Sequence, residues 1–409
     1  MSTALYVCYL GLDEPLVATQ VRPYLRALVA RGHRIHLLTF ETARRDAAAT
    51  AALRQTLAAE GIAWHALRYH RWPSLPATLY DVARGVLCSW RLARAHGIEL
   101  VHARSHVGAA IALPLRSLAG LPFVFDVRGL LPDEYADAGH WRRGGLKYRL
   151  GKAMERVFFR RAAALVVLTE TVRADLAATG GPLASRDPAD VTVIPCCVDL
   201  DRSPWDEPAR AALRRARGWS DRRVVVYVGK LGMWYLDAEM ARFFARGHRQ
   251  DPRFFLQLLT SSPADALRRT LVEAGVPEDA FDVRAVPPAQ VPALLHAADA
   301  GLSLIKPCAS KRSSSPTKVG EYLAAGLPVV STAGIGDCDR QLADGRGVLL
   351  GSLDDAAYDA AARALAVLLD DPDTRGRCRA FAEDELSLAR TGGPRYASVY
   401  ARALAGTGA

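Results

Sequence analysis

Short apolar runs alternate with helical patterns along most of the chain. In the first half, the runs that have the length of buried strands lie at residues 4–10, 34–40, 99–104, 122–128, 164–169 and 191–195. Between most of them, apolar residues recur every three or four positions, as they do from Val21 to Val29. This alternation of strand and helix predicts a parallel, doubly wound sheet in an α/β fold.

A second alternation follows residues 199–208, whose proline and acidic residues are typical of a linker. Its predicted strands lie at residues 223–229, 254–260, 281–286, 300–305, 327–332 and 347–350. The pattern is helical from residue 359 onward, with a final helix predicted over 395–405. We therefore expect two Rossmann-like domains, 1–200 and 201–385, that face a central cleft, and a C-terminal helical segment, 386–409, that packs on the first domain.

The composition agrees with two globular domains. The 409 residues exceed one ordinary core, and the contents of 50% hydrophobic and 23% charged residues are those of a soluble protein. No apolar run is long enough to span a bilayer, and the first residues lack the features of a signal peptide, so we expect a cytoplasmic protein. The seven cysteines include no CxxC pair, which favours small buried side chains over metal or redox chemistry.

The net charge of +10 favours anionic partners: nucleic acid, phosphorylated small molecules or an acidic membrane surface. We expect no nucleic-acid partner, because zinc-ligand spacing, an aromatic RNA platform and a helix-turn-helix signature do not accompany the charge.

Much of the charge lies in a basic amphipathic segment, residues 141–161. Its apolar face comprises Leu146, Leu150, Met154, Val157 and Phe158, which eight basic residues surround against one acid, Glu155. Such a helix either rests on the inner, anionic face of a membrane or packs on the core with a solvated basic face, the commoner arrangement.

The segment KRSSSPTKVGEYLAAGLPVVS, residues 311–331, carries the most specific pattern. Ser315-Pro316 predicts a helix start, which places Lys318 in the first turn, where the helix dipole disfavours a cation. An anion bound by the free N–H groups near Thr317 and Lys318 would reverse that penalty. Glu321, one turn deeper, is suited to accept hydrogen bonds from a ribose diol. The pattern indicates a nucleotide-diphosphate site, or alternatively a solvated Lys–Glu pair on a surface helix.

This segment resembles the signature of glycosyltransferase family 4, retaining enzymes of the GT-B fold. The family commonly carries a Glu-x7-Glu motif before an AxGxPVV run. Glu321 matches the second, ribose-binding glutamate, whereas the first would fall at Ser313 and is absent; the sequence instead has the Ser-x-Pro-x-Lys variant at residues 314–318. The resemblance therefore implies donor contacts from this segment and leaves open the sugar contact that the missing glutamate would make; the candidates are Arg312, Ser313, Ser315, Thr317, Lys318 and Glu321.

The resemblance continues along the second domain. VVVYVGKLGMWYLDAEM resembles the family's opening strand, where an Arg after the glycine and a later Lys bind the donor pyrophosphate; Lys230, after Gly229, matches the first. The second has no counterpart, and Lys318 or Arg312 would supply its charge. Residues 283–299 resemble the segment whose backbone touches the base, which implies base contacts from Arg284 and Val286.

In the first domain, PFVFDVRGLLPDEY resembles the segment that faces the cleft. Arg128 aligns where many family members have a His near the reacting sugar, and Asp126 precedes it on the same side of the strand. The two either form an ion pair that orders the loop, or Arg128 stabilises the leaving phosphate. We therefore assign Asp126, Arg128 and Lys230 as candidate catalytic residues.

Further candidates for the acceptor side follow other predicted strands. Gly11 occupies the place of the family's glycine-rich loop, and His102 and Arg104 lie at another strand end. Glu134 lies in the loop after Arg128 and would contact the acceptor.

The resemblance implies a retaining transferase that uses a nucleotide-diphosphate sugar, with a UDP-sugar favoured over a GDP-sugar, and that requires no metal ion or other cofactor. The acceptor hydroxyl would belong to a glycan, a lipid-linked intermediate or a small natural product. A sugar-nucleotide epimerase, a phosphorylase and a non-catalytic nucleotide-binding subunit remain the alternatives.

Overall fold

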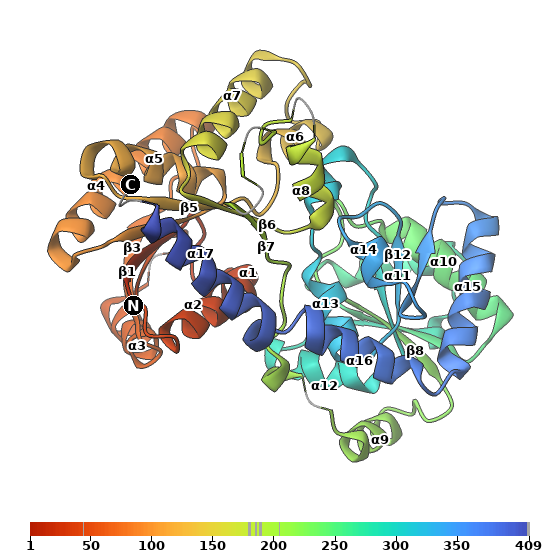
Figure 1. Ribbon diagram of the computed structural model, residues 1–409. Helices are drawn as coiled ribbons and strands as arrows, with labels where there is room; N and C mark the ends of the chain where they lie inside the picture. Colours follow the sequence, from red (N-terminus) through yellow and green to blue (C-terminus); the bar gives the residue numbers. More distant parts are fainter. Residues whose placement is uncertain (44, 179–180, 185, 188–189, 204, 407–409) are drawn as a thin grey trace. The chain divides into compact units, whose positions relative to one another are not determined.

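A computed structural model describes residues 1–43, 45–178, 181–184, 186–187, 190–203 and 205–406 (Figure 1). The chain divides into two compact units, one formed by Met1–Pro195 with Leu388–Ala409 and the other by Cys196–Ser387. Each unit has one parallel sheet flanked by helices. The predicted class, two doubly wound α/β units, is confirmed.

The sheet of the first unit has the strand order β3-β2-β1-β4-β5-β6-β7, and its neighbouring strands pair in parallel. Its strands are β1 (Thr3–Cys8), β2 (Arg34–Glu41), β3 (Ile62–Arg68), β4 (Leu100–Arg104), β5 (Phe123–Asp126), β6 (Ala164–Val167) and β7 (Val191–Val193). Apolar side chains fill the space between the central strands and the helices, and Leu5, Val101 and Phe125 are fully buried.

The helices of the first unit are α1 (Pro15–Gln20), α2 (Arg22–Val29), α3 (Ala47–Ala59), α4 (Ser74–His96), α5 (Ser105–Ala119), α6 (Leu131–Asp137), α7 (Leu146–Arg161), α8 (Glu170–Ala177) and α17 (Gly393–Ala405). Helix α17, from the end of the chain, lies beside α2 and contacts β4, β5 and β6 (Figure 1). Its buried residues Tyr396, Val399, Tyr400 and Ala403 recur every three or four positions, so they form the face that packs on this unit.

The second unit repeats the same topology. Its strand order is β10-β9-β8-β11-β12-β13, with parallel pairing between neighbours. The strands are β8 (Arg223–Val228), β9 (Phe254–Leu259), β10 (Phe281–Arg284), β11 (Ala300–Ser303), β12 (Val329–Thr332) and β13 (Gly347–Leu350). The helices are α9 (Glu207–Ala216), α10 (Asp237–Gln250), α11 (Ala264–Glu273), α12 (Val291–Ala297), α13 (Thr317–Ala324), α14 (Cys338–Gln341), α15 (Asp355–Asp370) and α16 (Thr374–Glu385).

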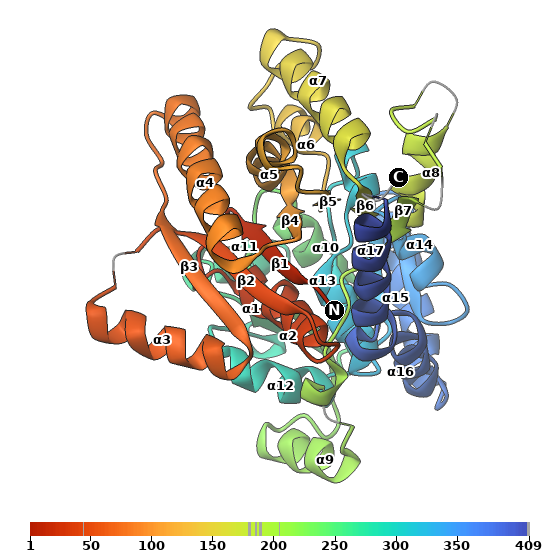
Figure 2. The same ribbon diagram turned by 60° about the vertical axis from the view of Figure 1, so that its left-hand side comes forward.

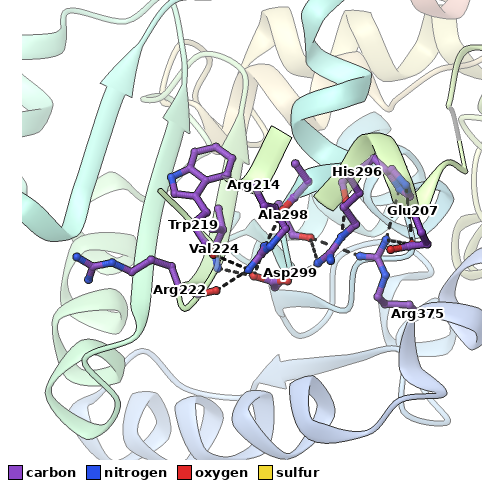
Figure 3. A network of polar contacts seen from close by, with 11 residues as sticks. Glu207, Arg214, Trp219, Arg222, Val224, His296, Ala298, Asp299 and Arg375 are labelled. Carbon is purple, nitrogen blue, oxygen red and sulfur yellow. Dashed lines mark hydrogen bonds and ion pairs between the residues drawn. The ribbon is translucent and has the colours of Figure 1, made fainter. Parts of the chain in front are cut away.

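A polar network ties α9 to the sheet of the second unit (Figure 3). Asp299, just before β11, accepts hydrogen bonds from Arg210 at 2.5 Å, from Arg214 at 2.8 Å and from the Val224 N–H at 2.7 Å. Arg214 also donates to the carbonyls of Trp219 and Arg222. Because all of these groups lie within the second unit, Asp299 holds the start of β8 and β11 in place, and its role is structural.

The strand order reverses in direction at one point of each sheet, between β1 and β4 and between β8 and β11. Ligands of open α/β sheets bind at such points, beyond the carboxyl ends of the strands. In the first unit Gly11 and Arg104 lie there, and in the second Gly229 and the segment after β11 lie there. The topology therefore predicts that ligands bind at these loops.

Candidate functional site

The start of α13 carries the most distinctive group of the second unit. The helix begins at Thr317, with Pro316 in the N-cap position, one residue later than predicted. The prediction that Ser315 caps the helix is wrong, because its hydroxyl instead accepts a hydrogen bond from the Cys196 N–H at 3.1 Å. Lys318 is then the second helical residue, where the backbone N–H groups have no acceptor within the helix.

Lys318 is a buried cation that lies against aromatic rings. Its side chain is 5% exposed, and its Nζ lies 3.8 Å from the ring centre of Tyr227 and 3.5 Å from that of Tyr235. Within the described part of the chain, this ammonium has no hydrogen-bond partner. Burial lowers the pKa of Lys318 well below its usual value, and Glu321 only partly opposes that effect. The cation–π contacts supply no oxygen or nitrogen acceptor, so the ammonium can still donate a hydrogen bond to an anion.

The loop after β8 comes close to this ammonium because Gly229 has no side chain. A Cβ at Gly229 would lie 3.6 Å from the Lys318 Nζ, and its φ of +119° is a conformation that side-chain-bearing residues rarely adopt. The hydroxyl of Tyr227 donates to the Lys230 carbonyl at 2.7 Å, which fixes the ring beneath Lys318. The Lys230 side chain itself is exposed at the same loop. Sequence positions 229, 230 and 318 thus meet at the switch point of the second sheet.

Glu321 lies one turn after Lys318 and is partly buried. Burial raises the pKa of Glu321 to about 7, while Lys318 and Arg202 act in the opposite direction. A carboxylate with this pKa is poised between an acceptor and a donor of hydrogen bonds near neutral pH. Gly326, with φ of +74°, follows α13, and the Leu327 N–H donates to the Tyr322 carbonyl at 2.9 Å, as in a left-handed helix cap.

The aromatic residues that line this site were not predicted from the sequence. Lys311 is buried with its Nζ 4.1 Å from the ring centre of Trp234, whereas its predicted neighbour Arg312 is exposed. Tyr235 forms an isolated antiparallel β-bridge with Ile305, a residue in the segment that follows β11. The adjacent Trp234 and Tyr235 after β8 were the available signal, because aromatic faces can hold lysine side chains that come from elsewhere in the chain.

The remaining donor-side candidates differ in their surroundings. Ser313 is buried and donates to the Ser310 carbonyl at 2.7 Å, so it braces the turn before α13. Arg284 is exposed beside Asp282, and its carbonyl accepts the Thr260 N–H at 3.0 Å within the sheet. Val286 is partly buried and packs on the core, and its contact with a base stays a prediction.

The first unit contains a buried charged cluster at the ends of β4 and β5. Asp126 is inaccessible, and its Oδ2 accepts a hydrogen bond from the Tyr396 hydroxyl at 3.0 Å. The same oxygen lies 3.5 Å from His102 Nε2 and 3.8 Å from Arg104 Nη1, and Asp126 Oδ1 lies 3.8 Å from Arg128 Nη1. Burial would raise the pKa of Asp126, but Arg128 leads the neighbours that lower it.

This geometry makes Asp126 a positioning residue, since a carboxylate without solvent access cannot touch a substrate. It also favours the ion pair between Asp126 and Arg128, one of the two arrangements expected from the sequence. Burial lowers the pKa of His102, which keeps that imidazole neutral among the two arginines. One carboxylate thus faces Arg104 and Arg128, so this buried cluster carries a net positive charge.

The loops at the same edge of the sheet carry the other predicted residues of the first unit. Arg128 has φ of +56° and is followed by Gly129, where a Cβ would lie 2.9 Å from Glu134 Oε1. Gly11 is buried, and a Cβ there would lie 3.3 Å from Glu41 Oε2. Glu41, which the sequence did not single out, accepts the Leu12 N–H at 3.1 Å and holds the Gly11 loop against β2.

Comparisons with known proteins agree with this architecture. Residues 17–202 match the model of Glycosyltransferase Family 4. The sequence has no match among curated proteins. Among solved structures, HepE from Anabaena in complex with UDP and glucose has a TM-score of 0.69 at 15% identity, over 98% of this chain and 100% of that one.

Two further solved structures have the same fold. Sucrose-phosphate synthase from Thermosynechococcus elongatus has a TM-score of 0.72 at 15% identity, over 99% of this chain and 100% of that one. A protein from Listeria monocytogenes described as a putative UDP-N-acetylglucosamine 2-epimerase has a TM-score of 0.63 at 12% identity, over 97% and 95% of the two chains. At these identities the likeness shows the fold, which is GT-B.

The raised pKa of Glu321 predicts a pH-dependent stability. An unfolded glutamate ionises near pH 4.5, whereas the folded carboxyl ionises at about 7, so the folded state loses stability as pH rises through this window. Glu321→Gln removes that loss. We expect the variant to gain stability relative to wild type between pH 5 and pH 8, on the order of 1–2 kcal/mol after allowance for solvent screening.

Urea denaturation of both proteins at the two pH values measures this gain. The control Glu278→Gln alters an exposed glutamate of the same unit. Its free energy of unfolding is expected to differ from that of wild type by the same amount at pH 5 and at pH 8. A Glu321→Gln difference that does not change with pH would contradict the assigned pKa.

Proposed function

We propose that this chain is a family 4 glycosyltransferase, in line with the family model that matches residues 17–202 and with its GT-B fold. In this proposal it is a retaining enzyme that moves a sugar from a UDP-sugar to an acceptor hydroxyl. The observation that carries the proposal is the unpartnered, buried Lys318 ammonium beside Gly229 at the start of α13. A donor diphosphate fits this place because it supplies the anion that both the ammonium and the helix N-terminus favour.

The other donor groups follow from the geometry around Lys318. Glu321, one turn further into α13, accepts hydrogen bonds from the ribose hydroxyls in its ionised form. Lys230 and Lys311 add positive charge on the loops on either side. These cations and the helix end neutralise the diphosphate, so we propose that no metal ion is needed for donor binding.

Uracil is the base we propose, and retention is the stereochemical outcome. HepE, which shares the fold, has been solved with UDP and with UDP-glucose. In the proposed reaction, the bond from the anomeric carbon to the phosphate oxygen breaks while the acceptor oxygen bonds to the same face of the sugar. The departing phosphate takes the proton of the acceptor hydroxyl. Lys318 stabilises the charge that develops on that phosphate.

Lys318→Met separates diphosphate binding from nucleoside binding. We expect about a 30-fold loss of affinity for UDP and little change for uridine, because a hydrogen bond to a charged group contributes about 2 kcal/mol. Glu321→Ala is expected to weaken both ligands, because both contain the ribose. Isothermal titration calorimetry with UDP and uridine measures these effects, with Lys147→Met, an exposed lysine of the first unit, as the control. Equal losses of affinity for UDP and for uridine in Lys318→Met would contradict the proposed contact between Lys318 and the diphosphate.

A second candidate function is sugar-nucleotide epimerisation, which the likeness to the Listeria protein favours. An epimerase converts UDP-N-acetylglucosamine without an acceptor, whereas a transferase releases UDP only as sugar leaves it for an acceptor or water. Product analysis after incubation with the UDP-sugar alone distinguishes the two.

We also propose that the acceptor is membrane-associated and that α7 contacts an anionic membrane. Leu146, Leu150 and Met154, spaced four residues apart, are 84%, 62% and 39% exposed. Phe158, predicted on the same face, is buried, so the apolar face splits into an exposed stripe near the start of α7 and a core contact near its end. Basic residues flank the exposed stripe, which suits anionic lipid. No helix among the described residues has the length and apolar character needed to cross a bilayer.

A second exposed apolar group extends the proposed surface. Trp72, Leu75 and Leu79, at the start of α4, are 82%, 63% and 60% exposed. Helices of a doubly wound sheet run antiparallel to its strands, so the first turns of α4 and α7 both lie toward the carboxyl edge of the sheet. That edge also carries Arg128 and Glu134, which we propose on the acceptor side.

The double variant Leu146→Glu/Leu150→Glu tests the membrane contact. We expect at least a tenfold loss of binding to phosphatidylcholine vesicles that contain phosphatidylglycerol, since each inserted leucine contributes about 1.5–3 kcal/mol. Vesicle co-sedimentation measures the binding. The control Leu118→Glu changes a leucine that is 70% exposed at the far end of α5 and is expected to have no effect. Equal vesicle binding by wild type and the double variant would contradict the proposal.

A further inference from the structure

Three histidines of the first unit converge away from the carboxyl edge of its sheet. His36 lies on β2, His65 on the edge strand β3, and His96 is the last residue of α4, which contacts β3 (Figure 2). One ring nitrogen from each lies within 4.8 Å of the other two, and His36 Nδ1 lies 3.1 Å from His65 Nε2. The His36 and His65 rings stack, with centroids 5.3 Å apart and an interplanar angle of 4°.

The cluster lies away from the carboxyl edge of the sheet. His36 is the third residue of β2, close to its amino end, and the C-terminus of α4 lies toward the same edge because this helix runs antiparallel to the strands. A metal ion here would therefore be separate from the proposed acceptor-side groups of this unit.

The geometry fits the ligand set of a first-row transition metal. Two imidazole nitrogens that bind one tetrahedral Zn²⁺ at about 2.0–2.1 Å lie about 3.3 Å apart, close to the spacing of His36 and His65. His96 is exposed, so its ring has room to turn toward the other two. Three imidazoles with a fourth position open to water form a recurrent zinc set, and imidazole also suits Cu²⁺ and Ni²⁺.

The end of α4 also favours a cation. The last carbonyls of α4 carry the negative end of the helix dipole, and His96 and the left-handed Gly97 lie at that end. Arg54 is a nearby opposing charge, but it lies on an exposed position of α3.

We propose that His36, His65 and His96 form a zinc site that fastens the C-terminus of α4 to the β2–β3 edge of the first unit. The ion cross-links three segments that are separate in the sequence. Because it binds the folded arrangement and not the dispersed histidines of the unfolded chain, it stabilises this unit.

Titration of metal-free protein with ZnCl₂ tests the proposal. The protein is prepared without a histidine tag and treated with a chelator, and binding is measured by calorimetry. We expect one Zn²⁺ per chain and a higher Tm in its presence. His36→Gln/His65→Gln should abolish the binding and the Tm shift, whereas His140→Gln, an exposed histidine outside the cluster, should preserve both.

His96→Gln keeps the test decisive if the double variant folds poorly, because His96 is exposed and its replacement leaves the sheet intact. We expect at least a tenfold loss of zinc affinity in this variant, and Arg54→Gln should instead tighten binding by removing a like charge. Absence of zinc binding by wild type, or equal affinity in wild type and His96→Gln, would overturn the proposal.

Discussion

The buried ammonium of Lys318 is the constraint around which the second unit's site is built. Two tyrosine rings hold it, Tyr227 from β8 and Tyr235 from the loop after that strand, while Gly229 leaves the space beside its Nζ clear. A cation in the first turn of a helix opposes the helix dipole, and burial adds a desolvation cost. The arrangement becomes favourable once an anion enters, because the ammonium, the free N–H groups of α13 and the anion then attract one another. In the proposed donor complex, the ribose then lies within reach of Glu321, one turn further along.

The first unit contains a buried anion, where the second unit contains a buried cation. Asp126 is inaccessible, yet it stays charged because Arg128, His102, Arg104 and the Tyr396 hydroxyl surround it. Tyr396 belongs to α17, so the end of the chain completes a cluster that begins at β4 and β5. This explains how residues far apart in the sequence fix the loop that carries Arg128. Its left-handed backbone then places Gly129 against Glu134, which orders the start of α6.

Periodicity predicted the strands of both sheets because most are short apolar runs buried on two faces. It missed β3, an edge strand in which His65 and exposed residues interrupt the apolar pattern. Lys318 and Glu321 could be found from local spacing, since a helix start is encoded by neighbouring residues, whereas Gly229 and Lys230 were implied by the resemblance to the family. The contacts of Lys318 with Tyr227 and Tyr235, and of Asp126 with Tyr396, could not, because side chains 83–270 residues apart meet only through the fold. The histidine cluster was missed for the same reason: its members come from two strands and a helix end.

A crystal structure of the protein with UDP tests the central claim most directly. The account predicts that diphosphate oxygens lie within hydrogen-bond distance of Lys318 Nζ and of the first N–H groups of α13, with the ribose hydroxyls on Glu321. A complex in which the diphosphate binds elsewhere, while the Lys318 ammonium keeps only its contacts with Tyr227 and Tyr235, would contradict it.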